Sequence, residues 1–208
     1  DAPAETELHS AIETGSLREV LRLLNFGVSL AVKDDKGRTP LHLATELKDR
    51  PIVETLLQKG ANVEVTDPCG HTALHLAVMN DDIGLVRVLI AFMSNVEAEN
   101  TLMRRPIHLA AQNGSEAIVN TLIQCDATPH PVDGRGNLPL HLAAGHGHHK
   151  VVKQLIDKAP SGSLSSWGWT PLHAASSAGH DKVVSLLLRR GADKDAKDVY
   201  KWLPVHLA

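Results

Sequence analysis

One residue type recurs along this chain at almost constant spacing. Seven of the thirteen histidines occupy the same place in a short recurring motif, whose full form Thr-Pro-Leu-His-Leu-Ala occurs at residues 39–44. They lie 33, 33, 33, 33, 32 and 33 residues apart, at His9, His42, His75, His108, His141, His173 and His206. A fixed period near 33 with a constant motif is the signature of stacked repeats, in which each unit buries its apolar face against its neighbours. The chain is therefore expected to form a linear stack of small units.

Residues 37–67 show how one unit is expected to fold. Thr39 is a suitable N-cap, and Pro40 suits the first helical position, where its missing N–H costs nothing. After a turn, the apolar residues between 52 and 57 predict the buried stripe of a second helix. Gly60 then suits the left-handed residue that ends this helix. The pattern predicts a helix-turn-helix unit followed by an extended segment.

The alternative is an α/β sheet whose parallel strands lie between the helices. Such strands need runs of β-branched residues, whereas the segments between helices, such as residues 63–65, are short and polar. Aromatic residues make up only 3% of a chain that is 43% hydrophobic. The core is therefore expected to consist of Leu, Ile, Val and Ala, and the fold class is expected to be all-α.

The motif and the period resemble those of the ankyrin repeat family over nearly the whole chain, from about Ala4 to Ala208. The resemblance implies an ankyrin-repeat solenoid of stacked helix-turn-helix units with β-hairpin tips, forming a single domain over residues 1–208. The repeats are expected at about 4–33, 34–66, 67–99, 100–132, 133–164, 165–197 and, in part, 198–208. Because the last unit stops within its first helix and no polar capping repeat is visible, we expect a fragment of a longer ankyrin array.

The resemblance implies a non-catalytic protein–protein interaction module. It would bind a protein or peptide through the concave surface formed by the hairpin tips and the adjoining ends of the inner helices. The alternative is the cytosolic or sensing arm of a larger membrane or multidomain signalling protein, which would use the same surface. An enzyme domain decorated with repeats is disfavoured, because no phosphate loop, nucleophile elbow or zinc-protease motif is present. No catalytic residue and no cofactor are expected.

The binding residues are expected at the variable positions of that surface. All three tryptophans and the only tyrosine fall on two adjacent tips, and these residue types dominate interface hot spots. The second interpretation is that these rings contact a further part of the last repeat. Basic tip residues beside them favour a partner with an exposed hydrophobic residue and flanking acids. The candidate residues are Trp167, Trp169, Tyr200, Trp202, Arg135, Arg104, Leu102, Arg38, Met79, Gln112 and His146.

The resemblance also gives the repeated histidines a structural role. Each ring is expected to bond to the Thr that caps its own helix and to the loop of the next repeat, so no metal site is expected. A metal site is the alternative, but no Cys or carboxylate completes it at ligand spacing. Its histidines would be His146, His148, His149 and His180. Cys69, in the tripeptide Pro68-Cys69-Gly70, is expected to be an ordinary tip residue.

Charge and composition limit which classes of partner and which cellular compartments are expected for this chain. The formal net charge is −3, with 21 basic and 24 acidic residues interleaved, which argues against nucleic-acid binding. No segment approaches the roughly 18 apolar residues of a membrane span, so no direct membrane contact is expected. Two distant cysteines and a start without signal-peptide features favour a reducing compartment, the cytoplasm or alternatively the nucleus.

Overall fold

The computed structural model describes residues 4–159 and 162–208, and the chain divides into two compact units, residues 1–101 and 102–208. The first unit contains α1 (Ala4–Glu13), α2 (Leu17–Asn25), α3 (Pro40–Glu46), α4 (Arg50–Gln58), α5 (Ala73–Met79) and α6 (Ile83–Ala91). The second contains α7 (Pro106–Asn113), α8 (Glu116–Gln124), α9 (Pro139–Gly145), α10 (His149–Leu155), α11 (Pro171–Ser177), α12 (Asp181–Arg189) and the 3-10 helix η1 (Pro204–His206). None of the described residues lies in a β-strand, so the all-α prediction is confirmed.

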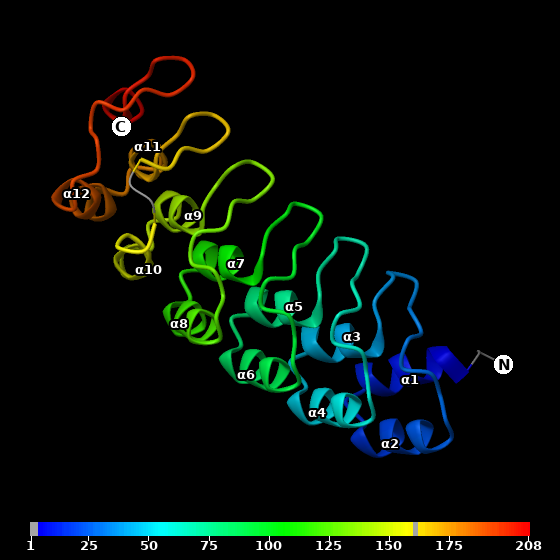
Figure 1. Cartoon of the computed structure of the whole chain (residues 1–208). Coiled ribbons are helices and arrows are strands. Elements are labelled where there is room, and N and C mark those ends of the chain that lie inside the picture. The colour runs from blue at the N-terminus through cyan, green and yellow to red at the C-terminus, as the bar shows by residue number, and fades with distance from the viewer. Residues whose placement is uncertain (1–3, 160–161) are drawn as a thin grey trace. The chain divides into compact units, whose positions relative to one another are not determined.

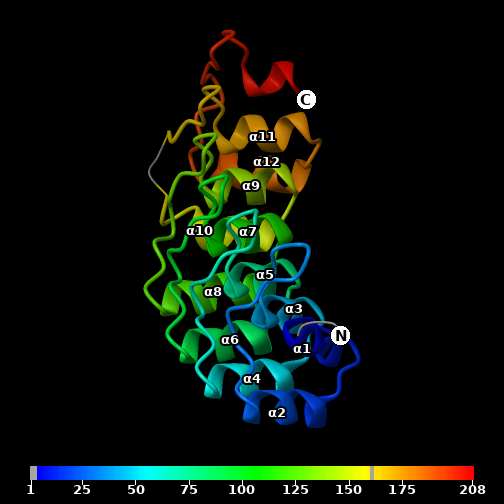
Figure 2. The ribbon, with the colours of Figure 1, turned by 90° about the vertical axis from the view of Figure 1, so that its right-hand side faces the viewer.

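Within each unit the helices occur in pairs that stack on one another. In the first unit, α1, α3 and α5 pack as one row, and α2, α4 and α6 pack as a second (Figure 1). In the second unit, α7, α9, α11 and η1 form one row, and α8, α10 and α12 form the other (Figure 2). The loops between successive pairs project as tips beside the row of first helices (Figure 1). These helix pairs are the predicted stacked helix-turn-helix repeats. The single domain over residues 1–208 stays a prediction, and positions 160 and 161 of the expected repeat 133–164 lie outside the described residues.

The start of α3 shows why the repeated motif forms a helix. The Thr39 side chain accepts a hydrogen bond from the His42 backbone N–H, and the His42 ring Nδ1 accepts one from the Thr39 N–H at 3.2 Å. Pro40 follows at the first helical position, as predicted. This reciprocal arrangement satisfies backbone donors that the first turn of a helix otherwise leaves unpaired.

The core is built from small and aliphatic side chains. Helices α3 and α4 pack against each other, and Leu41 and Ala44 of α3 and Ile52 and Leu56 of α4 are each at most 2% exposed. Ala44 presents only a methyl group, so the neighbouring first helices can approach closely. The predicted aliphatic core is confirmed.

Each tip is a hairpin-shaped loop and not the predicted pair of β-strands. In residues 34–38, the Asp34 N–H donates to the Arg38 carbonyl and the Gly37 N–H donates to the Asp34 carbonyl, both at 2.9 Å. Asp34 Oδ1 also accepts from the backbone N–H groups of Lys36 and Arg38, at 3.0 and 2.8 Å. The carboxylate thus closes a tight turn whose few backbone bonds do not extend into a ladder. The same arrangement forms around Asp67, Asp133 and Asp198.

Candidate functional site

Three consecutive tips of the second unit line an open cavity of about 660 Å³, here called the aromatic hollow. The tips are residues 133–137, 165–169 and 198–202. All three tryptophans and the only tyrosine of the chain line this one cavity. Its wall consists of Trp167, Trp169, Tyr200, Trp202, Arg135, Asn137, Ser165, Asp198 and Leu207.

Backbone contacts bring these tips together. The Ser166 N–H donates to the Arg135 carbonyl at 3.0 Å, and the Val199 N–H donates to the Trp167 carbonyl at 3.2 Å. Gly136 makes the approach possible, because its φ is +72° and a Cβ there would lie 2.7 Å from the Ser166 backbone nitrogen. Neighbouring tips are therefore close enough for their rings to share one cavity.

Asp198 holds one of the rings in place. Its Oδ1 accepts from the backbone N–H groups of Tyr200 and Trp202, both at 2.8 Å, and its Oδ2 accepts from the Trp169 indole N–H at 3.3 Å. Desolvation opposes ionisation of Asp198, but these three donors together hold its pKa below the ordinary value. Trp169 also stacks on His173, with ring centroids 6.4 Å apart. The Trp169 ring is thus fixed as part of the wall.

The other three rings are open to solvent. Trp167 is 57% exposed, Tyr200 67% and Trp202 51%. Large exposed rings gathered around one cavity are the kind of apolar surface that marks an interaction site. Their faces are available to an incoming side chain.

Of the three arginines predicted for the binding surface, only Arg135 lines the hollow. It is exposed, and the described part of the chain offers it no ion-pair partner. Arg38 instead pairs with Asp34 at 2.7 Å and with Glu46, and its side chain is only 13% exposed.

Arg104 is likewise engaged within the chain. It donates to Asp133 Oδ2 at 3.2 Å and to Gln112 Oε1 at 2.9 Å, and its side chain is 17% exposed. Arg38 and Arg104 are therefore less available to a partner than Arg135, because each is paired with carboxylates of its own chain.

The remaining predicted residues lie outside the aromatic hollow. Leu102 and Met79 are exposed, at the 100–104 tip and at the end of α5. His146 follows α9, where its Nδ1 bonds to the Leu142 carbonyl at 2.9 Å and its ring stacks on that of His148. Arg38 and Met79 belong to the first unit, and the other nine predicted residues belong to the second.

Four lining residues were absent from the prediction. Ser165 and Asp198 occupy the tip position that Asp34 holds in its own repeat, so the sequence predicts only a structural role for them. Asn137 and Leu207 carry no chemistry that would single them out. Only the repeat register places all four beside the rings: Asn137, Ser165, Asp198 and Leu207.

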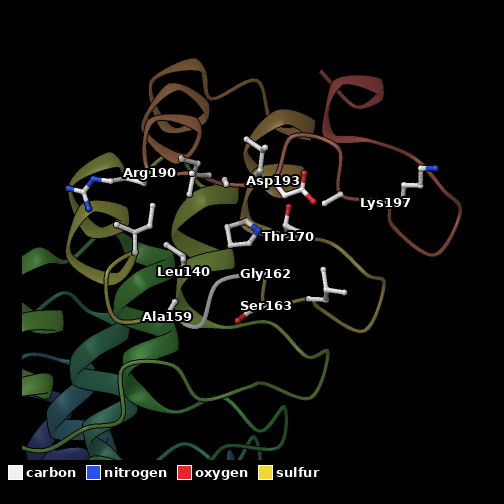
Figure 3. A pocket seen from close by; sticks show the side chains of 16 residues that line it. Leu140, Ala159, Gly162, Ser163, Thr170, Arg190, Asp193 and Lys197 are labelled. Atoms are coloured by element: carbon white, nitrogen blue, oxygen red, sulfur yellow. The ribbon is translucent and has the colours of Figure 1, made fainter.

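A second cavity of about 570 Å³ lies in the same unit, beside the segment after α10 (Figure 3). Apolar side chains such as Leu140 and Leu187 line it together with Thr170, Asp193 and Lys197. Thr170 and Asp193 point toward each other, whereas Lys197 points away (Figure 3). Two polar groups thus meet in this cavity, but none of the aromatic side chains of the chain lines it, in contrast to the aromatic hollow.

The predicted bond to the capping Thr forms at His42, His75 and His173, whereas at His108 and His141 the ring accepts only from the backbone N–H of the cap residue. The predicted bond to the next tip is also present. Nε2 of His42 donates to the His71 carbonyl at 3.0 Å, and Nε2 of His141 donates to the Trp169 carbonyl at 2.9 Å. Burial lowers the pKa of His42 and His108, and it lowers the pKa of His141 to about 4. These rings are neutral links between one helix and the next tip.

The histidines weighed as metal ligands are also bonded to backbone. Nε2 of His148 donates to the Gln112 carbonyl at 2.8 Å, and Nε2 of His180 donates to the Gly145 carbonyl at 3.1 Å. Among the described residues they form no group of three potential ligands. Nor does any helix described here have the length and apolar character needed to cross a bilayer.

Comparisons with known proteins agree with this architecture. The family model for ankyrin repeats (three copies) matches residues 1–67, 60–133 and 107–198. The ankyrin repeat domain of Bcl-3, a member of the IκB family, is 29% identical with a TM-score of 0.84, over 97% of this chain and 93% of that one. The human ASB11 ankyrin repeat domain is 25% identical with a TM-score of 0.86, over 100% of this chain and 92% of that one. A search of curated protein sequences found no match. The chain belongs to the ankyrin repeat family.

Proposed function

We propose that this chain is a non-catalytic interaction module that binds a protein or peptide partner through the aromatic hollow. Ankyrin repeat domains generally act as protein–protein interaction modules. The observation that carries the proposal is the gathering of every Trp and Tyr of the chain around one open cavity on adjacent tips. Binding here requires no catalytic group, since the cavity offers shape, rings and one exposed cation.

The lining of the hollow defines the partner. An apolar side chain inserted between Trp167 and Trp202 would remove their exposed faces from water, which is the source of energy at most hot spots. Arg135 at the rim is then suited to an acidic residue beside that anchor. Asp198 does not call for a cation from the partner, because three donors of its own chain already surround its oxygens.

Selection from a random peptide library displayed against the 208-residue chain tests this proposal. We expect a consensus with one large apolar residue and an Asp or Glu one or two positions away. Trp167→Ala should weaken binding of the consensus peptide by about 2 kcal/mol, or roughly thirtyfold, as loss of a hot-spot ring does. Arg135→Glu should mainly slow association, and more so at low salt.

Lys182→Glu provides the matched control. Lys182 is an exposed residue of α12 that does not line the hollow, and its substitution makes the same change of charge as Arg135→Glu. It should leave the association rate almost unchanged. Thermal unfolding should be the same in all three variants, because Trp167 and Arg135 lie on tips that contain little of the core and Lys182 is exposed on α12. A selected peptide that binds equally well to Trp167→Ala would contradict the proposal.

A further inference from the structure

The tip at residues 67–71 carries three different metal-ligating side chains. The Asp67 carboxylate, the Cys69 thiol and the His71 imidazole place their ligand atoms within 4.8 Å of one another. Asp67 Oδ2 and His71 Nδ1 are 3.2 Å apart. No other group of three such residues occurs in the part of the chain that the structure describes.

The backbone holds all three positions in place. Asp67 Oδ1 accepts from the N–H groups of Cys69 and His71, both at 2.8 Å. The carbonyl of Cys69 accepts from the N–H and the hydroxyl of Thr101, at 3.1 and 2.9 Å. The carbonyl of His71 accepts from Nε2 of His42 at 3.0 Å. A ligand set on such a backbone loses little conformational entropy when it binds an ion.

The other tips show what is unusual about this one. Asp34 Oδ2 pairs with the Arg38 guanidinium, and Asp133 Oδ2 accepts from Arg104. Both partners are permanent cations. At Asp67 the corresponding oxygen faces an imidazole, which carries a charge only when it is protonated. At the fourth such tip, Asp198 Oδ2 accepts from the Trp169 indole N–H. Of these four tips, that at residues 67–71 is therefore the one in which the second carboxylate oxygen faces another metal-ligating group.

We propose that Asp67 Oδ2, Cys69 Sγ and His71 Nδ1 bind one divalent metal ion of borderline softness, with Zn²⁺ as the biological case. A mixed O, N and S set is typical of zinc sites. Two ligands about 2 Å from a tetrahedral ion are about 3.3 Å apart, which matches the observed Asp67–His71 separation.

Binding requires a defined movement of protons. The Cys69 thiol releases its proton to solvent and binds as thiolate. The neutral His71 ring carries its proton on Nε2, so that Nδ1 donates its lone pair to the ion. Three protein ligands leave the fourth position to water. This proposal departs from the prediction that Cys69 is an ordinary tip residue and that the chain has no metal site.

Titration of the full 208-residue chain with Zn²⁺, in competition with a chromogenic chelator, tests the site. We expect one high-affinity ion per chain and a cobalt-substituted spectrum with a thiolate charge-transfer band. Cys69→Ser should weaken affinity at least tenfold, since loss of even an outer-shell partner costs that much. The double variant Cys69→Lys with His71→Arg copies Lys36 and Arg38 of the preceding tip, so it should fold and lose the ion.

Cys125→Ser is the matched control, because it removes the other thiol and should leave zinc affinity unchanged. Circular dichroism of each variant confirms that the fold is intact. Two results would overturn the proposal. One is an unaltered chain that binds no stoichiometric zinc. The other is zinc binding that survives both tip variants, which would assign the ion to histidines elsewhere.

Discussion

At the scale of single residues, the repeated histidine works only as a neutral ring. Nδ1 of His141 accepts from the Leu138 N–H at 3.1 Å, while Nε2 donates to the Trp169 carbonyl at 2.9 Å. One nitrogen must therefore lack a proton and the other must carry it. His141 thus joins the start of α9 to the tip that carries two of the rings of the aromatic hollow.

Because these rings must stay neutral to keep both bonds, we expect the protein to lose stability in mild acid. His42, His108 and His141 have folded-state pKa values below the ordinary 6.5, so the unfolded chain takes up protons first as the pH falls. Their stabilisation is fully present above pH 6.5 and is lost as the pH falls from 6.5 through the folded-state pKa of each ring. For His141, whose pKa is about 4, the loss over that window is of order 3 kcal/mol.

Urea unfolding at pH 7 and pH 5 measures this effect. We expect a lower free energy of unfolding at pH 5, and a shallower pH dependence in a His141→Gln variant that is less stable overall. Equal stability at the two pH values would show that these rings are not held neutral by the fold.

The sequence predicted the structural role of the repeated histidines, but it did not predict that Arg38 and Arg104 form ion pairs within the chain. The bond from the ring to a carbonyl of the next tip recurs at His9, His42, His108, His141 and His173, so the motif and its family resemblance were enough to predict it. Arg38 finds Glu46 eight residues away, and Arg104 finds Asp133 in the next tip. Such pairs depend on the side-chain conformation of two long residues and on the stacking of neighbouring repeats, which no local pattern specifies.

At the scale of the elements, the 33-residue register also indicates where the backbone is strained. Gly60 ends α4 with φ +90°, and the equivalent residues after α6 and α8 are Met93 at +65° and Asp126 at +64°. The left-handed region costs a non-glycine residue about 1–2 kcal/mol. The helices themselves were predicted correctly, because capping residues and apolar stripes are local signals.

Met93→Gly is therefore expected to raise the free energy of unfolding by about 1 kcal/mol. The Met93 side chain is 86% exposed, so its removal costs little packing. Gly60→Ala is the converse control. A Cβ there meets nothing within 4 Å, so any loss of stability reports the backbone alone. Denaturant unfolding of both variants checks the pair, and a less stable Met93→Gly would mean that the methionine packs favourably in solution.

At the scale of the whole molecule, the sequence predicted that the aromatic residues lie on adjacent tips but not that they line one cavity. The tip register put four aromatic residues on adjacent tips. It could not show that they surround one cavity, because ring orientation depends on the bond from Trp169 to Asp198 and on the close approach at Gly136. In the first unit, one tip carries three potential metal ligands instead of aromatic rings, namely Asp67, Cys69 and His71.

The three tryptophans make the central claim directly measurable, since all of them line the aromatic hollow. Proton–nitrogen correlation spectra of the isotope-labelled chain contain one indole N–H signal for each. When the selected peptide is added, the signals of Trp167 and Trp202 should shift most, because these rings are exposed. The signal of Trp169, whose indole N–H is bonded to Asp198, should shift less. Indole signals that stay fixed while backbone signals elsewhere move would contradict binding through the aromatic hollow.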